Sequence, residues 1–253
     1  MIKKYIQSLL GSFGLRITKL ENELFNKTPV EASDEEKELI QLIKKYSMNS
    51  SLRSWILIIA LKEIFEKNIE GDFVETGVWR GGNLILFKKY IQKYNLKDKK
   101  IFGYDTFEGF PEPTTNDKDF KNINAFEYIK NKKVENFSSY HSKISLDQVK
   151  ENFIKETGDS DNLFLFKGST NDTLQKNSNL PDKIAILKLS TCFYESTKFE
   201  LEIMYEKLQK GGYLIIDDYG WWKGAKLAFD EFFKNNKKNL HFVDHTSRFF
   251  IKD

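Results

Sequence analysis

The chain has 253 residues and a formal net charge of +3, from 40 basic and 37 acidic side chains. This length fits one large domain, or a domain with an appendage, and allows a substantial buried core. The balanced charge, without a polybasic block, gives no indication of a nucleic-acid partner. The single cysteine, Cys192, excludes an internal disulfide framework, and no apolar run is long enough to span a bilayer. We expect a cytoplasmic protein.

Apolar side chains recur at helical spacing in residues 1–20, beside the basic Lys3 and Lys4. We expect this helix to pack on its own domain. A peripheral membrane contact and an oligomer contact are the alternatives, and we expect the protein to form a homo-oligomer. Helical periodicity returns at residues 38–46 and 51–66. We assign residues 1–65 to an N-terminal helical extension and residues 66–253 to the main domain.

Residues 71–82 read Gly-Asp-Phe-Val-Glu-Thr-Gly-Val-Trp-Arg-Gly-Gly. This order predicts a buried strand, a tight glycine turn and the N-terminus of a helix over 84–94. The glycine spacing is not Gly-x-Gly-x-x-Gly, so a dinucleotide pyrophosphate site is not indicated. An acid, Glu75, beside a glycine turn without a phosphate-binding lysine suits a cationic nucleoside such as S-adenosylmethionine. The alternative is an ordinary strand-to-helix turn.

A second strand at residues 100–105 ends in Asp105. An acid at this end of a strand in a doubly wound sheet can accept hydrogen bonds from both ribose hydroxyls of a nucleoside. The alternative is an aspartate that orders a turn or caps a helix. The long connection over 107–145 is typical of a lid or a binding loop.

Strands and helices alternate along the rest of the chain. We expect helices over 145–156, 195–208 and 225–234, with Gly211 and Gly212 stopping the second of them. We expect strands over 162–166, 184–189 and 213–216, and a closing hairpin from 240–243 and 247–252. This alternation predicts an α/β fold whose sheet is mostly parallel, with an antiparallel final strand.

Four stretches resemble the macrocin O-methyltransferase family, whose members methylate sugar hydroxyls of antibiotics and have relatives among polysaccharide genes. These stretches lie at residues 75–82, 105–111, 193–197 and 211–219. The resemblance implies a Rossmann-like, class I methyltransferase fold with a seven-stranded sheet and an S-adenosylmethionine cofactor. It also implies O-methylation of a sugar hydroxyl on a glycan or a sugar-containing metabolite.

The resemblance carries over to individual residues. It assigns cofactor binding to Glu75, Thr76, Gly77, Gly81, Asp105, Thr106, Phe107, Gly168 and Ser169. Asp217 and Asp218 match two acids that bind magnesium in the family, and they are the candidate catalytic residues. An alternative role for this pair is capping a helix and ordering a loop.

The third metal acid of the family is missing from this chain. Relatives carry Asp-Gly-Asp where this chain has Ser190, Thr191 and Cys192. The acid at the position of Ser190 is the implied metal ligand and general base, so we expect at most a weak magnesium dependence, which Ser190→Asp should increase. Two alternative functions are a cofactor-binding protein without transferase activity and a metal-independent transferase acting on an amine.

Overall fold

The computed structural model describes residues 27–130 and 143–253, together with Leu10. The helix expected over 1–20 lies outside the described residues except for Leu10, as does part of the long connection. Among the described helices, none is both long and apolar enough to cross a membrane.

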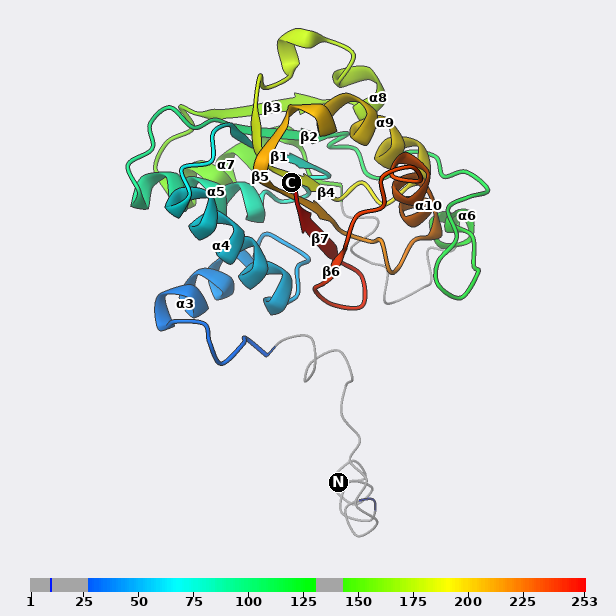
Figure 1. The fold of residues 1–253 in the computed structure, drawn as a ribbon, viewed down its shortest axis with the longest axis horizontal. Coiled ribbons are helices and arrows are strands. Elements are labelled where there is room, and N and C mark those ends of the chain that lie inside the picture. The colour runs from blue at the N-terminus through cyan, green and yellow to red at the C-terminus, as the bar shows by residue number, and fades with distance from the viewer. Residues whose placement is uncertain (1–9, 11–26, 131–142) are drawn as a thin grey trace.

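Within the described residues, seven strands form one sheet in the order β3-β2-β1-β4-β5-β7-β6 (Figure 1). Neighbouring strands from β3 to β5 are parallel, whereas β7 is antiparallel to β5 and to β6. The mostly parallel sheet with an antiparallel closing strand is therefore confirmed. The strand bounds are β1 Asp72–Thr76, β2 Ile101–Asp105, β3 Leu163–Lys167, β4 Ile184–Leu189, β5 Leu208–Ile216, β6 His241–Phe242 and β7 Arg248–Ile251.

Helices cover both faces of the sheet (Figure 1). One face packs against α3 (Asp34–Ile43), α4 (Ser51–Glu66), α5 (Gly82–Lys93) and α7 (Leu146–Thr157). The other packs against α9 (Tyr194–Met204) and α10 (Lys223–Phe232), with the short α8 (Thr170–Thr173) at its edge. The short helix α6 (Ala125–Lys130) lies beside α10.

Side-chain alternation along the central strands divides the core between the two faces. Phe73, Ile186 and Ile215 pack with the helices of the α4 face. Their neighbours in the chain, such as Val74 and Leu187, pack with those of the α9 face. The same alternation continues past the strand ends and decides which polar residues meet there.

The predicted end of the helix over 195–208 is wrong. Helix α9 stops at Met204, a 3-10 turn follows over Tyr205–Lys207, and β5 begins at Leu208. The two glycines lie inside β5, where the register with β4 shifts. Gly211 has a φ of +81°, and a Cβ there would lie 2.7 Å from the side chain of Ile69. The glycine pair therefore forms a bulge in a strand rather than a helix stop.

The helices expected before the first strand are closely joined to the sheet. Side chains of α3 and α4 belong to the same buried cluster as Phe73 of β1 and the apolar face of α5. The division of the chain at residue 65 stays a prediction, as do the homo-oligomer and the membrane contact.

Candidate active site

An open cavity of about 440 Å³ lies at the C-terminal ends of β1, β2, β4 and β5. Its volume is within the range of small-molecule sites in proteins, and this edge of a parallel sheet is where such folds bind ligands. Most of the predicted site residues line it: Glu75, Gly77, Asp105, Thr106, Phe107, Gly168, Ser169, Ser190, Asp217 and Asp218. Thr76 and Gly81 are outside this lining.

The glycine turn after β1 brings two strand ends together. Gly77 has a φ of +75°, and a Cβ there would lie 2.4 Å from the carbonyl oxygen of Ser190. Any larger residue would therefore push the turn away from the end of β4. Gly81 adopts a left-handed conformation as the N-cap of α5, and the Thr76 hydroxyl donates to Glu200 at 3.0 Å. These two residues shape the turn from outside the cavity.

Glu75 is 1% exposed. Its Oε1 accepts a 2.6 Å hydrogen bond from Asn83 Nδ2 of α5, whereas its buried Oε2 has no hydrogen-bond partner. Burial raises the pKa of Glu75 to about 7. A buried carboxylate oxygen without a partner at a cavity wall favours a ligand that donates a hydrogen bond or carries positive charge.

Asp105 orders the turns on both sides of its strand end. Its Oδ2 accepts from the backbone N–H of Trp79 at 3.0 Å, and its Oδ1 accepts from that of Phe107 at 2.8 Å. The Thr106 hydroxyl also lies 3.4 Å from Oδ1, so Oδ2 is the oxygen that keeps a further lone pair. The turn-ordering role is therefore present in the structure, and hydrogen bonding to a ribose stays a prediction.

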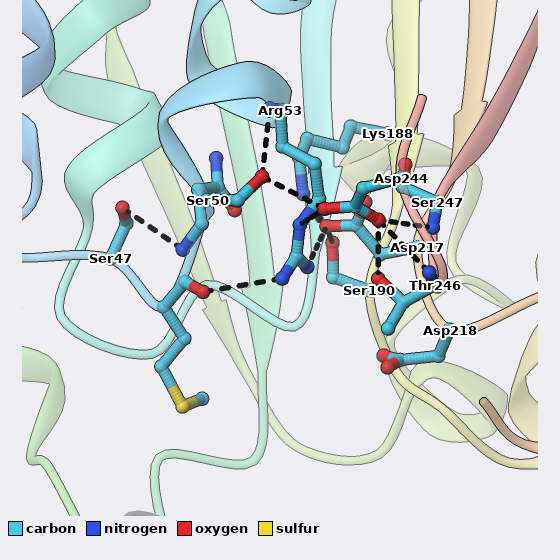
Figure 2. A network of polar contacts seen from close by, with 12 residues as sticks. Ser47, Ser50, Arg53, Lys188, Ser190, Asp217, Asp218, Asp244, Thr246 and Ser247 are labelled. Atoms are coloured by element: carbon cyan, nitrogen blue, oxygen red, sulfur yellow. Dashed lines mark hydrogen bonds and ion pairs between the residues drawn. The ribbon is translucent and has the colours of Figure 1, made fainter. Parts of the chain in front are cut away.

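A buried ion network surrounds Asp217 (Figure 2). Lys188 Nζ lies 2.5 Å from Asp217 Oδ2, 2.6 Å from Ser190 Oγ and 3.4 Å from Glu75 Oε1. From α4, Arg53 places Nη1 3.8 Å from Asp217 Oδ2 and Nε 3.0 Å from Asp244 Oδ2. Two cations thus lie among the carboxylates at the ends of β1 and β5 and in the turn after β6.

The ion pairs favour the charged forms of Asp217, Lys188 and Asp244. Burial alone would raise the pKa of Asp217, but the charges of Lys188 and Arg53 outweigh it and lower that pKa. Burial likewise opposes the charge of Lys188, but Asp217 and Glu75 raise its pKa. For Asp244, Arg53 and two backbone N–H groups outweigh burial and lower the pKa to about 2.

Asp218 has a different environment from its neighbour. Its φ of +65° is unusual for a residue other than glycine, and its Oδ2 accepts from the thiol of Cys192 at 3.0 Å. Burial, and then the charge of Asp217, raise the pKa of Asp218. The pKa of the Cys192 thiol is itself raised well above its usual value, mainly by burial. Asp218 therefore lines the cavity, and its hydrogen-bond partner is a neutral thiol rather than a cation.

The residues present do not fit a magnesium ion. Within the part of the chain that the structure describes, no group of three or more His, Cys, Asp or Glu side chains could hold a metal. Magnesium is usually anchored by carboxylates. Here Ser190 offers a hydroxyl, and Asp217 is already paired with Lys188 and Arg53.

Four residues of the network were missed by the sequence analysis: Arg53, Asn83, Lys188 and Asp244. Lys188 had a usable signal, because a lysine in the otherwise apolar strand Ile-Ala-Ile-Leu-Lys-Leu must find a buried partner. Arg53 had a weaker signal as a charged residue near the start of an apolar helix. Asp244 follows a short strand in a polar turn, where nothing in the sequence sets it apart.

The model of the macrocin O-methyltransferase family matches residues 16–252 of this chain. The chain belongs to the macrocin O-methyltransferase family. The O-methyltransferase NovP has a similar structure, with a TM-score of 0.70 and 25% sequence identity over 82% of both chains. The Rossmann-like, class I methyltransferase fold expected from the sequence is thereby confirmed.

Two O-methyltransferases of Streptomyces species are similar to this chain in sequence. Demethyldecarbamoylnovobiocin O-methyltransferase of Streptomyces niveus is 29% identical over 178 residues, which span 68% of this chain and 62% of the relative. The second, from Streptomyces olivaceus, is 8-demethyl-8-(2,3-dimethoxy-alpha-L-rhamnosyl)-tetracenomycin-C 4'-O-methyltransferase. It is 28% identical over 161 residues, spanning 63% of this chain and 57% of the relative. The match thus covers about three fifths of either relative.

Proposed function

We propose that this protein transfers a methyl group from S-adenosylmethionine to a hydroxyl of a sugar, on a glycan or a sugar-containing metabolite. Membership of the macrocin O-methyltransferase family supports the reaction class, and the rhamnosyl-directed relative supports a sugar acceptor. The observation that carries the proposal is one cavity lined by Glu75 and Asp105, at the ends of the neighbouring strands β1 and β2, and by Asp218, which follows β5. A donor and an acceptor can meet in such a cavity.

S-adenosylmethionine would supply a sulfonium methyl group for direct displacement. For this donor, Asp105 Oδ2 has a lone pair for a ribose hydroxyl, and Glu75 Oε2 is a free acceptor for a positively charged group. Thr106, Phe107, Gly168 and Ser169 line the same side of the cavity. The protein's main task in such a reaction is to align the acceptor oxygen with the methyl group.

Asp218 is the residue that we assign to the acceptor proton. A sugar hydroxyl becomes a good nucleophile only as its proton is removed, and a positioned base typically contributes about 10²- to 10⁴-fold to the rate. The raised pKa of Asp218 makes it a stronger base than an ordinary aspartate. Asp217, held between Lys188 and Arg53, is assigned a positioning role.

Cofactor binding is tested by calorimetry with S-adenosylhomocysteine. We expect Asp105→Ala to weaken binding by about 1–3 kcal/mol, because charge-assisted hydrogen bonding to the ribose would be lost. The control is Asp182→Ala, which changes an exposed aspartate just before β4, at the opposite end of that strand from the cavity. Equal affinity in Asp105→Ala and the wild type would remove the ribose assignment.

Methyl transfer is tested with labelled S-adenosylmethionine and a panel of sugars, nucleotide sugars and amino sugars. We expect a hydroxyl acceptor, and a fall in kcat of about 10²- to 10⁴-fold in Asp218→Asn with unchanged cofactor affinity. Transfer to an amino sugar alone would favour the alternative of an amine acceptor. Cofactor binding without transfer to any acceptor would favour a binding protein.

A further inference from the structure

The cation closest to Asp217 is a side chain of the protein itself, Lys188. We infer that the Lys188 ammonium takes the position where a divalent metal ion would otherwise bind, and that it holds Asp217 and Ser190 in place of such an ion. The catalytic meaning of this inference rests on the proposed methyl transfer. The arrangement of charges does not depend on that proposal, because it follows from the fold alone.

Strand register places Glu75, Lys188, Ser190 and Asp217 on one face of the sheet. Lys188 of β4 lies between Glu75 of β1 and Ile215 of β5. Side chains two residues apart point to the same face, so Ser190 follows Lys188 and Asp217 follows Ile215 toward the α4 side. Lys188 is 2% exposed. Lys188 also lines the cavity, so its ammonium lies at the cavity wall and is almost fully withdrawn from solvent.

The contacts of Lys188 use the groups that a metal ion would need. Asp217 Oδ2 lies 2.5 Å from Lys188 Nζ and 3.3 Å from Ser190 Oγ. A magnesium ion on this carboxylate would sit about 2.0–2.1 Å from an oxygen, and so within a few ångströms of the ammonium. Arg53 Nη1 lies 3.8 Å from the same oxygen, Asp217 Oδ2 (Figure 2). Like charges so close together repel strongly at a buried site.

Ser190 and Lys188 therefore act together. The Ser190 hydroxyl accepts a 2.6 Å hydrogen bond from Lys188. A carboxylate introduced by Ser190→Asp would meet the ammonium at this short distance and form an ion pair with it. We therefore revise the expectation drawn from the sequence: Ser190→Asp alone should not create a metal site. Removing the ammonium as well should create one.

Manganese binding measured by electron paramagnetic resonance tests the inference without cofactor or acceptor. Three proteins are titrated with Mn²⁺ into the millimolar range: the wild type, Ser190→Asp, and the double variant Lys188→Met with Ser190→Asp. The matched control is Lys183→Met with Ser190→Asp, which has the same net charge but loses an exposed lysine paired with Glu70. Circular dichroism establishes that each variant is folded.

We expect the wild type and Ser190→Asp to leave Mn²⁺ free, and the Lys188 double variant to bind it about tenfold or more tightly than the control. Wild-type binding of one Mn²⁺ that Asp217→Asn abolishes would overturn the inference. So would equal Mn²⁺ affinity in the folded Lys188 double variant and the control. Failure to find methyl transfer would leave each of these readouts intact, so the two proposals fail separately.

Discussion

Two buried carboxylate clusters lie at the same strand ends, on opposite faces of the sheet. On the α4 face, Asp217 has Lys188 and Arg53 as partners. On the α9 face, Glu200 accepts hydrogen bonds from the hydroxyls of Thr76 and Thr191, both at 3.0 Å. The pKa of Asp217 is lowered, whereas burial raises the pKa of Glu200 to about 8.

For these two acids, the nearby cations rather than the depth of burial account for the opposite directions of the pKa shifts. Both carboxylates are buried to a similar degree. Consecutive residues divide between the clusters, because Glu75 and Ser190 face α4 whereas Thr76 and Thr191 face α9. Asp217 is thus charged on the face where α4 supplies Arg53, and Glu200 is a neutral acid on the opposite face.

The largest expected effect comes from breaking the ion network. Lys188→Met keeps a side chain of similar length but leaves Asp217 and Glu75 without their closest cation. Removing one partner of a buried ion pair typically costs about 3–5 kcal/mol, and we expect the free energy of unfolding to fall by that amount. Urea denaturation at neutral pH measures it.

Lys183→Met is the control for this loss of charge. Lys183 pairs with Glu70 on the surface, and exposed pairs contribute at most about 1 kcal/mol. If both variants lost equally little stability, Arg53 alone would be sufficient to stabilise Asp217, and Lys188 would not be needed for the charge on the α4 face.

Much of the fold could be predicted from periodicity and turn residues. The helix over 51–66 and the strand over 184–189 have the predicted bounds, because each is a long apolar run with a clear start. The end of α9 was wrong because a glycine pair at a strand bulge looks the same in sequence as one that stops a helix. Only the pairing of Leu208 with Ile184 distinguishes them.

The site was less accessible to sequence reasoning. The motifs around Glu75 and Asp105 are local, so their place at the cavity follows from the strand ends alone. The ion network joins Arg53, Lys188 and Asp244, which are far apart in the chain. Its existence depends on register and on the approach of α4, which no single stretch of sequence records.

The second-largest expected effect is the pH dependence that Glu200 gives to the free energy of unfolding. The pKa of Glu200 is about 8 in the folded protein, against about 4.3 in an unfolded chain. Between these values the unfolded state releases a proton that the folded state keeps, so rising pH lowers the free energy of unfolding. The slope from this group approaches about 1.4 kcal/mol per pH unit.

Glu200→Gln removes this slope while keeping a side chain that can accept from both threonines. We expect the difference in free energy of unfolding between variant and wild type to grow in favour of the variant from pH 5 to pH 8. Glu202→Gln, at an exposed position of the same helix, is the control and should follow the wild type. Parallel curves for Glu200→Gln and the wild type would mean that Glu200 is charged despite its burial.

The smallest expected effect sharpens the comparison by removing one hydroxyl from the neutral cluster. The Thr191 hydroxyl donates to Glu200 Oε2 and lowers the pKa of that carboxyl, against the larger effect of burial. Thr191→Val keeps the shape of the side chain and removes the donor. Because the hydroxyl stabilises the charged form of Glu200 more than the neutral form, the loss of stability should be about 1 kcal/mol at pH 9 and smaller at pH 5.

The pKa of Glu200 should also rise further in Thr191→Val. The free energy of unfolding of the variant should therefore level off at a higher pH than that of the wild type. Urea denaturation across this pH range gives both quantities. A loss that is the same at every pH would show that the Thr191 hydroxyl does not influence the protonation of Glu200.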